Sequence, residues 1–324
     1  MTVLRSTPAP DAAAYRKTML DKLADLTTEF DKALAGGGEK YVERHRERGK
    51  LTARERIDSV LDPASPFLEL MPLAAWGSDF QVGASLVGGI GVVEGVEVMV
   101  VANDPTVKGG TSNPWTLRKS LHLNDIAREN RLPVLSLVES GGADLPTQKE
   151  VFVPGGAMFR NLTQLSKAGI PTISVVYGNS TAGGAYIPGM SDHVVMIKER
   201  SKVFLAGPPL VKAATGEDVT AEELGGGAMH SSVSGVTDHL VDNDEQALRK
   251  VREIVATLGP RDPVQWDTVP PRDAVRIRSR RRLRQLGHID DQGGRLRAIE
   301  DAFHANPAER GRPAEDARPG DVGR

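Results

Sequence analysis

The sequence contains no cysteine among its 324 residues. Disulfide bonds, thiolate zinc sites and a cysteine nucleophile are therefore excluded. Aromatic residues make up only 4% of the chain. No run approaches the roughly 20 apolar residues of a membrane-spanning helix, and the first residues lack the apolar segment of a signal peptide. These absences predict a cytoplasmic protein that has no membrane partner.

The charges of the chain nearly balance, with 41 basic and 43 acidic residues and a formal net charge of -2. Such a chain has no overall attraction for nucleic acid, so an anionic ligand requires a local site. The seven histidines do not follow metal-ligand spacing. The P-loop pattern and the Gly-x-Ser-x-Gly hydrolase pattern are both absent. We therefore expect neither a metal site nor a nucleic-acid partner.

The sequence predicts an N-terminal helical arm over residues 1–50. Apolar residues recur at spacings of three and four between residues 15 and 34, which predicts a helix with one apolar face. The charge-rich stretch 40–56 is interpreted as a solvated face, with phosphate contacts as the alternative. A second short helix is expected to begin near Thr52.

Residues 51–265 are predicted to form the main domain, which has an α/β fold. Short runs rich in valine and isoleucine predict buried strands over residues 87–93, 96–102, 133–138, 171–177, 193–197 and 202–205. Helical patterns lie between and after them, over residues 114–130, 156–167 and 244–258. Alternating strands and helices favour a sheet with mainly parallel pairing.

The character of the chain changes again after about residue 259. Residues 266–324 are rich in Arg, Ala, Pro, Gly and Asp and have almost no apolar periodicity, which predicts a disordered tail. The arginine run over residues 276–285 leaves a nucleic-acid-binding arm as an alternative. No aromatic residues interleave those arginines, so the tail is the favoured interpretation.

Two glycine-rich turns follow predicted strands, at Ser140–Ala143 and Ala182–Ala185. Paired glycines at the carboxyl end of a strand let backbone N–H groups point outward, and a helix that starts there adds its dipole. A lone Gly-Gly pair is more often a tight turn, but two at equivalent positions favour a binding role. One amide from each turn would suit a thioester enolate oxygen, at about 3 to 4 kcal/mol per amide. The candidate donors are Gly142, Ala143, Gly183 and Gly184.

A third strand end carries a cation beside two glycines. Lys108 precedes Gly109 and Gly110 in the loop that begins at Asn103. The lysine suits a phosphate group of a ligand, and it suits equally a loop charge in water. Spacing alone leaves both interpretations open.

Five motifs together resemble the β subunits of biotin-dependent acyl-CoA carboxylases, which are carboxyltransferases. They are LTARERI (51–57), VKGG (107–110), ESGGA (139–143), TAGGAY (181–186) and FLAGPPLVKAATG (204–216). Within that family the chain is most similar to the methylcrotonoyl-CoA and geranyl-CoA carboxylase types. The resemblance covers roughly residues 15–265.

The resemblance implies a crotonase-like (ClpP/crotonase) superhelix of repeated ββα units. It implies that acyl-CoA lies along the loop that follows Asn103, with further substrate contacts from Ser140, Gly141, Tyr186 and Leu210. Biotin would be carried by a partner α subunit that also provides biotin carboxylase, and the β subunits would form a homo-oligomer. The base would be the released carboxylate or the ureido group of biotin, so no metal and no protein acid or base is required of this chain.

The tail is where the chain departs from this family. Members are longer and have a second crotonase-like domain that binds carboxybiotin, whereas residues 266–324 read as an arginine-rich tail. We interpret this as a truncation or a reading-frame change. The leading function is carboxyl transfer to a methylcrotonoyl-CoA-like substrate, in leucine degradation. One alternative is an acyl-CoA-binding remnant without turnover. Another is a crotonase-type hydratase or isomerase, although residues 182–191 lack the glutamate that this class usually has there.

Overall fold

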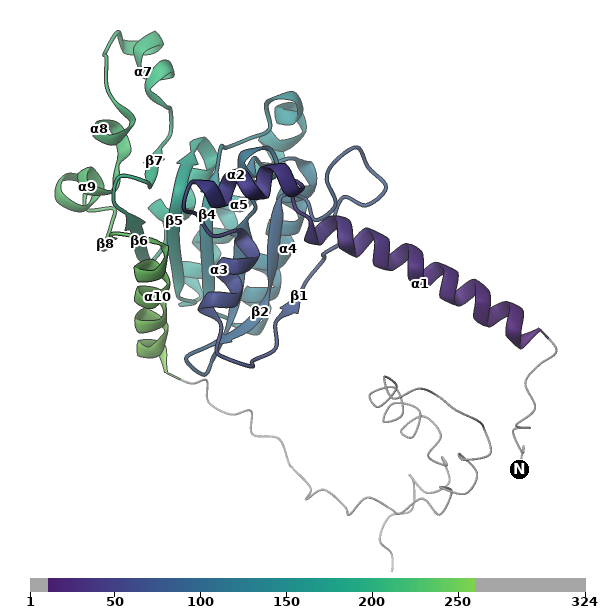
Figure 1. Ribbon diagram of the computed structural model, residues 1–324. Coiled ribbons are helices and arrows are strands. Elements are labelled where there is room, and N and C mark those ends of the chain that lie inside the picture. The colour runs from purple at the N-terminus through teal and green to yellow at the C-terminus, as the bar shows by residue number, and fades with distance from the viewer. Residues whose placement is uncertain (1–10, 260–324) are drawn as a thin grey trace, which may run out of the picture. The chain divides into compact units, whose positions relative to one another are not determined.

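The computed structural model describes residues 11–259 (Figure 1). The helices are α1 (Ala12–Leu34), α2 (Glu39–Glu47), α3 (Ala53–Val60), α4 (Pro114–Asn130), α5 (Gln148–Lys167), α6 (Tyr186–Gly189), α7 (Pro208–Thr215), α8 (Ala221–Gly225), α9 (Gly227–Met229) and α10 (Asp244–Leu258). The strands are β1 (Leu68–Glu69), β2 (Leu86–Val93), β3 (Val96–Asn103), β4 (Val134–Ser140), β5 (Thr172–Thr181), β6 (His193–Ile197), β7 (Lys202–Phe204) and β8 (His239–Val241).

One sheet joins all eight of these strands. Its order is β1-β2-β3-β4-β5-β6-β8, and β7 pairs with the end of β5 beyond β6. The pairs β1-β2 and β2-β3 are antiparallel, whereas the pairs from β3 to β8 are parallel. The predicted α/β fold with mainly parallel pairing is therefore confirmed.

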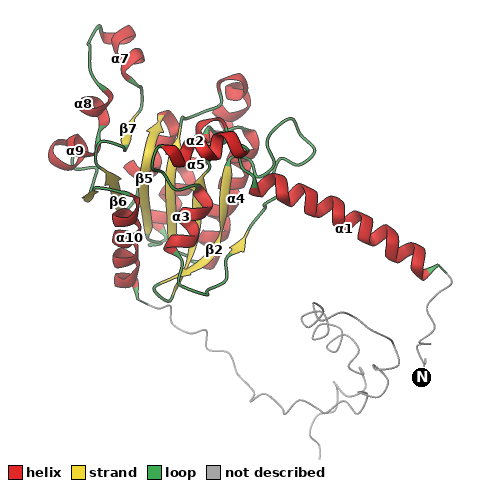
Figure 2. Cartoon of the chain, in the orientation of Figure 1, coloured by secondary structure: helices red, strands yellow, loops and turns green. Residues whose placement is uncertain are grey.

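Helices cover both faces of the sheet (Figure 2). The apolar side chains of β3 alternate between them, since Val98 and Val100 point to the face covered by α3 and α10, and Met99 points to the face covered by α4. Period-two alternation of this kind is what a strand buried on both sides requires. The parallel strands then end at one edge of the sheet, where the loops that follow β3, β4 and β5 meet.

Local signals explain why several elements begin where they do. The side chain of Thr52 accepts a hydrogen bond from the amide of Glu55, and Glu55 returns one to Thr52, which forms a capping box at the start of α3. Asn113 caps α4 in the same way, and Pro114 occupies the first helical position. The predicted helices over 114–130 and 244–258 are confirmed.

Other boundaries differ from the predictions. Helix α5 begins at Gln148 instead of residue 156, because the preceding turn Leu145–Thr147 runs directly into it and buried Val151 anchors its first half. Strand β5 continues to Thr181, past the predicted end at residue 177. The short strands β1 and β8 were not predicted. The predicted domain end at residue 265 and the tail 266–324 lie outside the described residues.

The interpretation of residues 40–56 as a solvated face is wrong in part. Helix α2 lies in this stretch and exposes most of its charges, but His45 is buried and Arg56 is fully buried. Helix α1 forms as predicted, and its apolar residues from Tyr15 to Leu34 are mostly exposed. Within the range 11–259, none of the helices has both the length and the apolar content for a membrane crossing.

Candidate functional site

The two glycine-rich turns lie side by side at the carboxyl edge of the sheet. We call Ser140–Ala143 the first turn and Ala182–Ala185 the second turn. Strands β4 and β5 are parallel neighbours, and Ser140 lies opposite Ser180. A Cβ atom on Gly142 would lie 3.3 Å from the carbonyl oxygen of Thr181 and 3.5 Å from the Cβ of Ala182. The structure therefore brings together the two turns predicted to act together.

The first turn is an irregular loop held by the chain that follows β3. The amide of Gly141 donates to the carbonyl of Gly109 at 3.0 Å. Ser112 donates to the carbonyl of Gly142 at 2.8 Å and accepts from the amide of Asp144 at 2.9 Å. Gly142 has a φ of +91°, a conformation that glycine adopts without steric cost. The first turn thus depends on contacts with residues 109–112.

The second turn is a short 3-10 helix, Ala182–Ala185, which leads directly into α6. Its hydrogen bonds are local, and the side chain of Ser180 donates to the carbonyl of Gly184 at 3.0 Å. Ala182 has a φ of +51°, which is uncommon for a residue with a Cβ atom. A Cβ atom on Gly183 would lie 3.8 Å from the ring of Phe159 on α5, so this helix flanks the second turn.

The amides of the two turns are not equally available to a ligand. Ser112 bonds to both neighbours of Ala143, so the amide of Ala143 itself points away from that bridge, and it donates to no acceptor within residues 11–259. The amide of Gly142 already donates to the side-chain oxygen of Ser140 at 3.2 Å. In the second turn, Gly183 occupies the second helical position, whose amide has no acceptor inside a 3-10 helix. Gly184 occupies the third, whose amide the i to i+3 pattern pairs with the residue before the helix.

The loop after β3 supports the first turn and also borders solvent. The side-chain oxygen of Asn103 accepts from the amide of Glu139 at 3.4 Å, which ties β3 to β4. Gly110 is buried, and a Cβ there would lie well inside van der Waals contact of the Glu139 carbonyl oxygen. Lys108 is exposed, with its Nζ 3.7 Å from a carboxylate oxygen of Asp144. Asn103 and Gly110 therefore have structural contacts, whereas Lys108 is open to a ligand.

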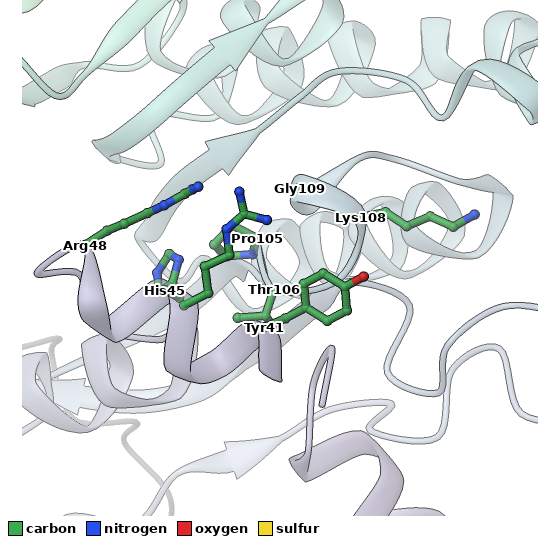
Figure 3. Close-up of a pocket in the computed structure, with 8 residues that line it drawn as sticks. Tyr41, His45, Arg48, Pro105, Thr106, Lys108 and Gly109 are labelled. Atoms are coloured by element: carbon green, nitrogen blue, oxygen red, sulfur yellow. The ribbon is translucent and has the colours of Figure 1, made fainter. Parts of the chain in front are cut away.

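A cavity of about 230 Å³ lies between α2 and this loop (Figure 3). Its lining residues are Tyr41, Arg44, His45, Arg48, Pro105, Thr106, Lys108 and Gly109. Arg44 lies in the last turn of α2, and Arg48 follows the helix four positions later, so both reach the same side. Neither forms an ion pair within the part of the chain that the structure describes. Sequence reasoning missed these two arginines, although phosphate contacts by this stretch were the alternative interpretation.

His45 forms the inner wall of this cavity. Its ring lies 3.1 Å from the carbonyl oxygen of Leu51, and burial is the main cause that lowers the pKa of this histidine, while the Glu139 carboxylate raises it. The neutral ring therefore prevails at neutral pH. The positive charge of the cavity comes from the arginines and Lys108.

The two predicted acyl-contact residues lie in different places. Tyr186 follows the second turn, is 41% exposed, and its ring centre is 4.6 Å from that of Phe159. Leu210 lies on α7, is 64% exposed, and α7 has no buried residue. Figure 1 shows α7 at the end of a segment that leaves β7. The structure brings Tyr186 to the turns, and nothing in it brings Leu210 there.

A buried charge network lies directly behind the turns and was also missed. Glu139, the residue before Ser140, forms ion pairs with Lys50 and with Arg56, the latter at 2.9 Å. Asp244 at the start of α10 lies 3.6 Å from Arg56 and pairs with Arg200. The motif LTARERI contains Arg56, but nothing in these seven residues distinguishes this arginine from an exposed one.

The turns themselves contain only serine, glycine and alanine, and therefore no titratable group. In residues 11–259 no cluster of three or more His, Asp or Glu side chains is arranged to hold a metal ion. The arrangement offers backbone N–H donors at the turns and cationic side chains in the cavity beside them. It provides no general acid or base within the turns.

A family described as "Carboxyl transferase domain" matches residues 44–289 of the chain. The chain is 68% identical over 259 residues to a probable biotin-dependent acyl-coenzyme A carboxylase beta2 subunit of Mycobacterium tuberculosis, which covers 79% of this chain and 49% of that relative. It is 54% identical over 250 residues to a biotin-dependent 3-methylcrotonyl-coenzyme A carboxylase beta1 subunit of the same organism, which covers 76% and 47%.

A solved structure of a carboxylase beta subunit also matches this chain. The geranyl-CoA carboxylase beta subunit of P. aeruginosa matches with a TM-score of 0.72 and 42% identity, over 79% of this chain and 48% of that one. The fold is therefore the crotonase-like fold of the carboxyltransferases. The chain spans about half the length of the curated relatives it matches.

Proposed function

Because this chain belongs to the carboxyl transferase domain family of the acyl-CoA carboxylase β subunits, we propose that it binds acyl-CoA and activates the thioester for carboxylation. The observation that carries this proposal is the contact between the two turns, where Gly142 lies against Thr181 and Ala182. Residues 51–265 would form the acyl-CoA-binding domain, with residues 1–50 as an N-terminal arm and 266–324 as a tail.

Ala143 and Gly183 are the proposed pair of amide donors, one from each turn. Their N–H groups would bind the thioester oxygen, which becomes negatively charged when the acyl group loses its α- or γ-proton. Preorganised amides stabilise such an enolate at little reorganisation cost. The amides of Gly142 and Gly184 would act as secondary donors. The Gly142 amide already donates to the side chain of Ser140, and the Gly184 amide has an acceptor through its position in the 3-10 helix.

The cavity at α2 is the proposed site for the phosphate groups of CoA. Arg44, Arg48 and Lys108 all line it, so three cations border a space of about 230 Å³. Guanidinium groups bind phosphate through paired N–H donors, and the ring of Tyr41 offers a flat surface beside them. Gly109 joins this cavity to the first turn, because its carbonyl accepts from Gly141. Asn103 and Gly110 would hold the loop in place.

The proposed acyl group is branched and unsaturated, as in methylcrotonoyl-CoA. Aromatic side chains of Tyr186 and Phe159 lie beside the second turn and offer apolar contacts for such a group. Relatives named for 3-methylcrotonyl-CoA and geranyl-CoA support this class. Ser140 and Gly141 would complete the contacts at the turns, and Leu210 would contact the substrate from α7, which lies apart from them.

Carboxybiotin, which we propose is carried by a biotinylated α subunit, would supply the carboxyl group. No described side chain is assigned to it. The role of this chain in the proposal is to hold the thioester, polarise its carbonyl and exclude water from that bond. We further propose that the chain functions in a homo-oligomer in the cytoplasm and needs no metal.

Carbon-13 NMR of the bound thioester tests the proposal directly. Methylcrotonoyl-CoA labelled at the thioester carbonyl is titrated with the purified chain, and the carbonyl signal is expected to move downfield on binding, because two N–H donors withdraw electron density from the oxygen. Unlabelled CoA, measured by calorimetry, reports on the phosphate site alone. Binding of CoA without any carbonyl shift of the acyl-CoA would contradict the role of the turns.

A reconstituted assay separates turnover from binding. The chain is mixed with a biotinylated α subunit, ATP, bicarbonate and methylcrotonoyl-CoA, and the carboxylated product is measured. Product formation would assign the whole transfer to this chain with its partner. Binding without product would favour the acyl-CoA-binding alternative, and hydration of crotonyl-CoA by the pure chain would favour the hydratase alternative.

A further inference from the structure

Arg56 on α3 is fully buried behind the two turns. Its guanidinium donates to the carboxylate of Glu139 at 2.9 Å and lies 4.0 Å from the centre of the Tyr177 ring. Glu139 immediately precedes the first turn, and Tyr177 lies on the part of β5 that leads into the second turn. One side chain therefore contacts both strands shortly before they reach the turns.

The pairing of β4 with β5 is irregular at this level. Val138 lies opposite Val176, but the next pair is Ser140 opposite Ser180, so β5 has extra residues between the two pairs. A bulge of this kind redirects the chain that follows it and occurs often beside active sites. The conformation of these extra residues therefore decides where the second turn lies relative to the first.

Glu139 is fixed against the extra residues of β5. Lys50 pairs with one of its carboxylate oxygens and Arg56 with the other. A Cβ atom on Gly178 would lie 2.7 Å from Oε1 of Glu139 and 2.9 Å from its Cδ, so the absence of a side chain at Gly178 lets the carboxylate lie on the β5 backbone. Arg56 contacts the same stretch through the face of the Tyr177 ring.

The burial of Arg56 is only partly compensated. Within residues 11–259, its Nε and Nη1 atoms and the hydroxyl of Tyr177 have no hydrogen-bond partner. Asp244 lies 3.6 Å from Nε, which is an ion-pair distance but too long for a good hydrogen bond. Well-packed apolar residues often stabilise a fold as well as a buried ion pair does. A buried cation of this kind suits a role in geometry better than one in stability.

We propose that Arg56 is a positioning residue that fixes the bulge of β5 against the end of β4, so that the amides of Ala143 and Gly183 converge on one thioester oxygen. Arg56 does not contact the substrate. The inference rests on the proposed function, because it presumes that the two turns share a ligand. It predicts that loss of Arg56 affects the thioester carbonyl and leaves the phosphate site at α2 in place.

The variants Arg56→Met and Arg56→Lys test the proposal in the full chain. Methionine removes the charge and the donors at similar length, and lysine keeps the charge without the planar fork. Arg252→Met is the matched control, since Arg252 on α10 is a partly buried arginine that bonds to Val60 and Asp62, away from the turns. Each variant is studied with carbonyl-labelled methylcrotonoyl-CoA by NMR, with CoA by calorimetry, and by thermal unfolding.

For Arg56→Met we expect the carbonyl shift to fall by more than about half and the affinity for acyl-CoA to fall about tenfold, since misaligned donors lose most of their effect. Affinity for CoA alone should stay within about twofold, because Arg56 does not line that cavity. Arg56→Lys should recover part of the shift, and Arg252→Met should keep all of it.

A folded Arg56→Met variant with the full carbonyl shift would overturn the proposal. If Arg56→Met does not fold, the variant Gly178→Ala tests the proposal instead. Its methyl group displaces the Glu139 carboxylate from β5 without removing any charge. A full shift in folded Gly178→Ala would then overturn the proposal, and a reduced shift would support it. Absence of any shift in the wild-type chain would instead contradict the proposed function.

Discussion

The two turns have almost the same sequence, Ser-Gly-Gly-Ala and Ala-Gly-Gly-Ala, but they are held in different ways. The first turn has no regular structure of its own and depends on hydrogen bonds to residues 109–112, which lie on a separate strand end. The second turn is a 3-10 helix continuous with α6, so its bonds are local. The same motif is therefore fixed by tertiary contacts at one position and by local structure at the other.

If the first turn depends on its contacts with residues 109–112, Gly110→Ala should lower the free energy of unfolding more than any other variant considered below. Gly110 has a φ of +68°, and a methyl group there would overlap the Glu139 carbonyl oxygen. We expect a loss of at least about 3 kcal/mol in the free energy of unfolding by urea, from backbone strain together with steric overlap. Gly109→Ala is the matched control, because Gly109 has the same φ of +68° and open space around it. Equal losses in the two variants would show that the support is unimportant.

Gly142→Ala should have the next largest effect, because it strains the first turn and presses on the second. A Cβ atom at this φ of +91° would lie 3.2 Å from the hydroxyl oxygen of Thr181. We expect a loss of about 2 kcal/mol in urea unfolding, most of it from the unfavourable backbone conformation. Gly235→Ala, with a φ of +73° and no atom within 4 Å, isolates the backbone part. If Gly235→Ala costs as much, contact between the turns contributes nothing.

The support of the first turn should also respond to pH. Ser112, which pairs with the first turn, leads into α4, and α4 is anchored by buried Lys119, whose Nζ donates to the carbonyls of Gly83 and Leu86 at 3.2 and 2.6 Å. Burial lowers the pKa of Lys119 to about 8. A neutral amine still has two N–H donors for these two carbonyls.

Because the pKa of Lys119 is lower in the folded chain than in the unfolded chain, the unfolded chain binds more protons above about pH 8, and stability rises with pH toward the unfolded pKa. Relative to Lys119→Met, which cannot titrate, the wild type should gain about 1.5 kcal/mol between about pH 8 and about pH 9.5. Urea unfolding at a series of pH values measures this gain. Lys212→Met, at an exposed lysine, should show no such difference, and a flat profile for both would refute the prediction.

The smallest effect is expected in the second turn, with Gly184→Ala. A Cβ atom there would lie 3.7 Å from the nearest atom, the hydroxyl oxygen of Ser180, which is ordinary contact. Alanine also loses less backbone entropy than glycine on folding, so the change should stay within about 0.5 kcal/mol or stabilise slightly. Thermal unfolding of Gly184→Ala and of Gly142→Ala under the same conditions measures the difference in stability between the two variants. Equal destabilisation of the two variants would mean that the turns are held alike after all.

Much of this architecture could be predicted because its signals are local. Runs of valine and isoleucine predicted six of the strands, and the helical pattern over residues 114–130 predicted α4 with its correct bounds. Strands β1 and β8 were missed because two or three residues carry no recognisable pattern. The start of α5 was misplaced because Pro154 and the glycines after it are typical of a break, whereas buried Val151 holds that half of the helix.

The candidate site was predicted in part for the same reason. Glycine pairs after strands are visible in the sequence, so both turns were found. Arg44, Arg48 and Arg56 lie in one charged stretch, and the sequence does not distinguish an arginine that lines a cavity from one that is buried. That difference depends on what the rest of the chain places around each side chain.

The α/β alternation, the family resemblance and the two glycine turns could be read from the amino-acid sequence, since each rests on residue types at short spacing. The contact between the turns and the burial of Arg56 behind them became visible only in the folded chain. Pairing of β4 with β5, including the irregular step before Ser180, brings residues far apart in the chain into contact. Spacing along the chain contains no information on such pairings, because they depend on the packing of the whole sheet.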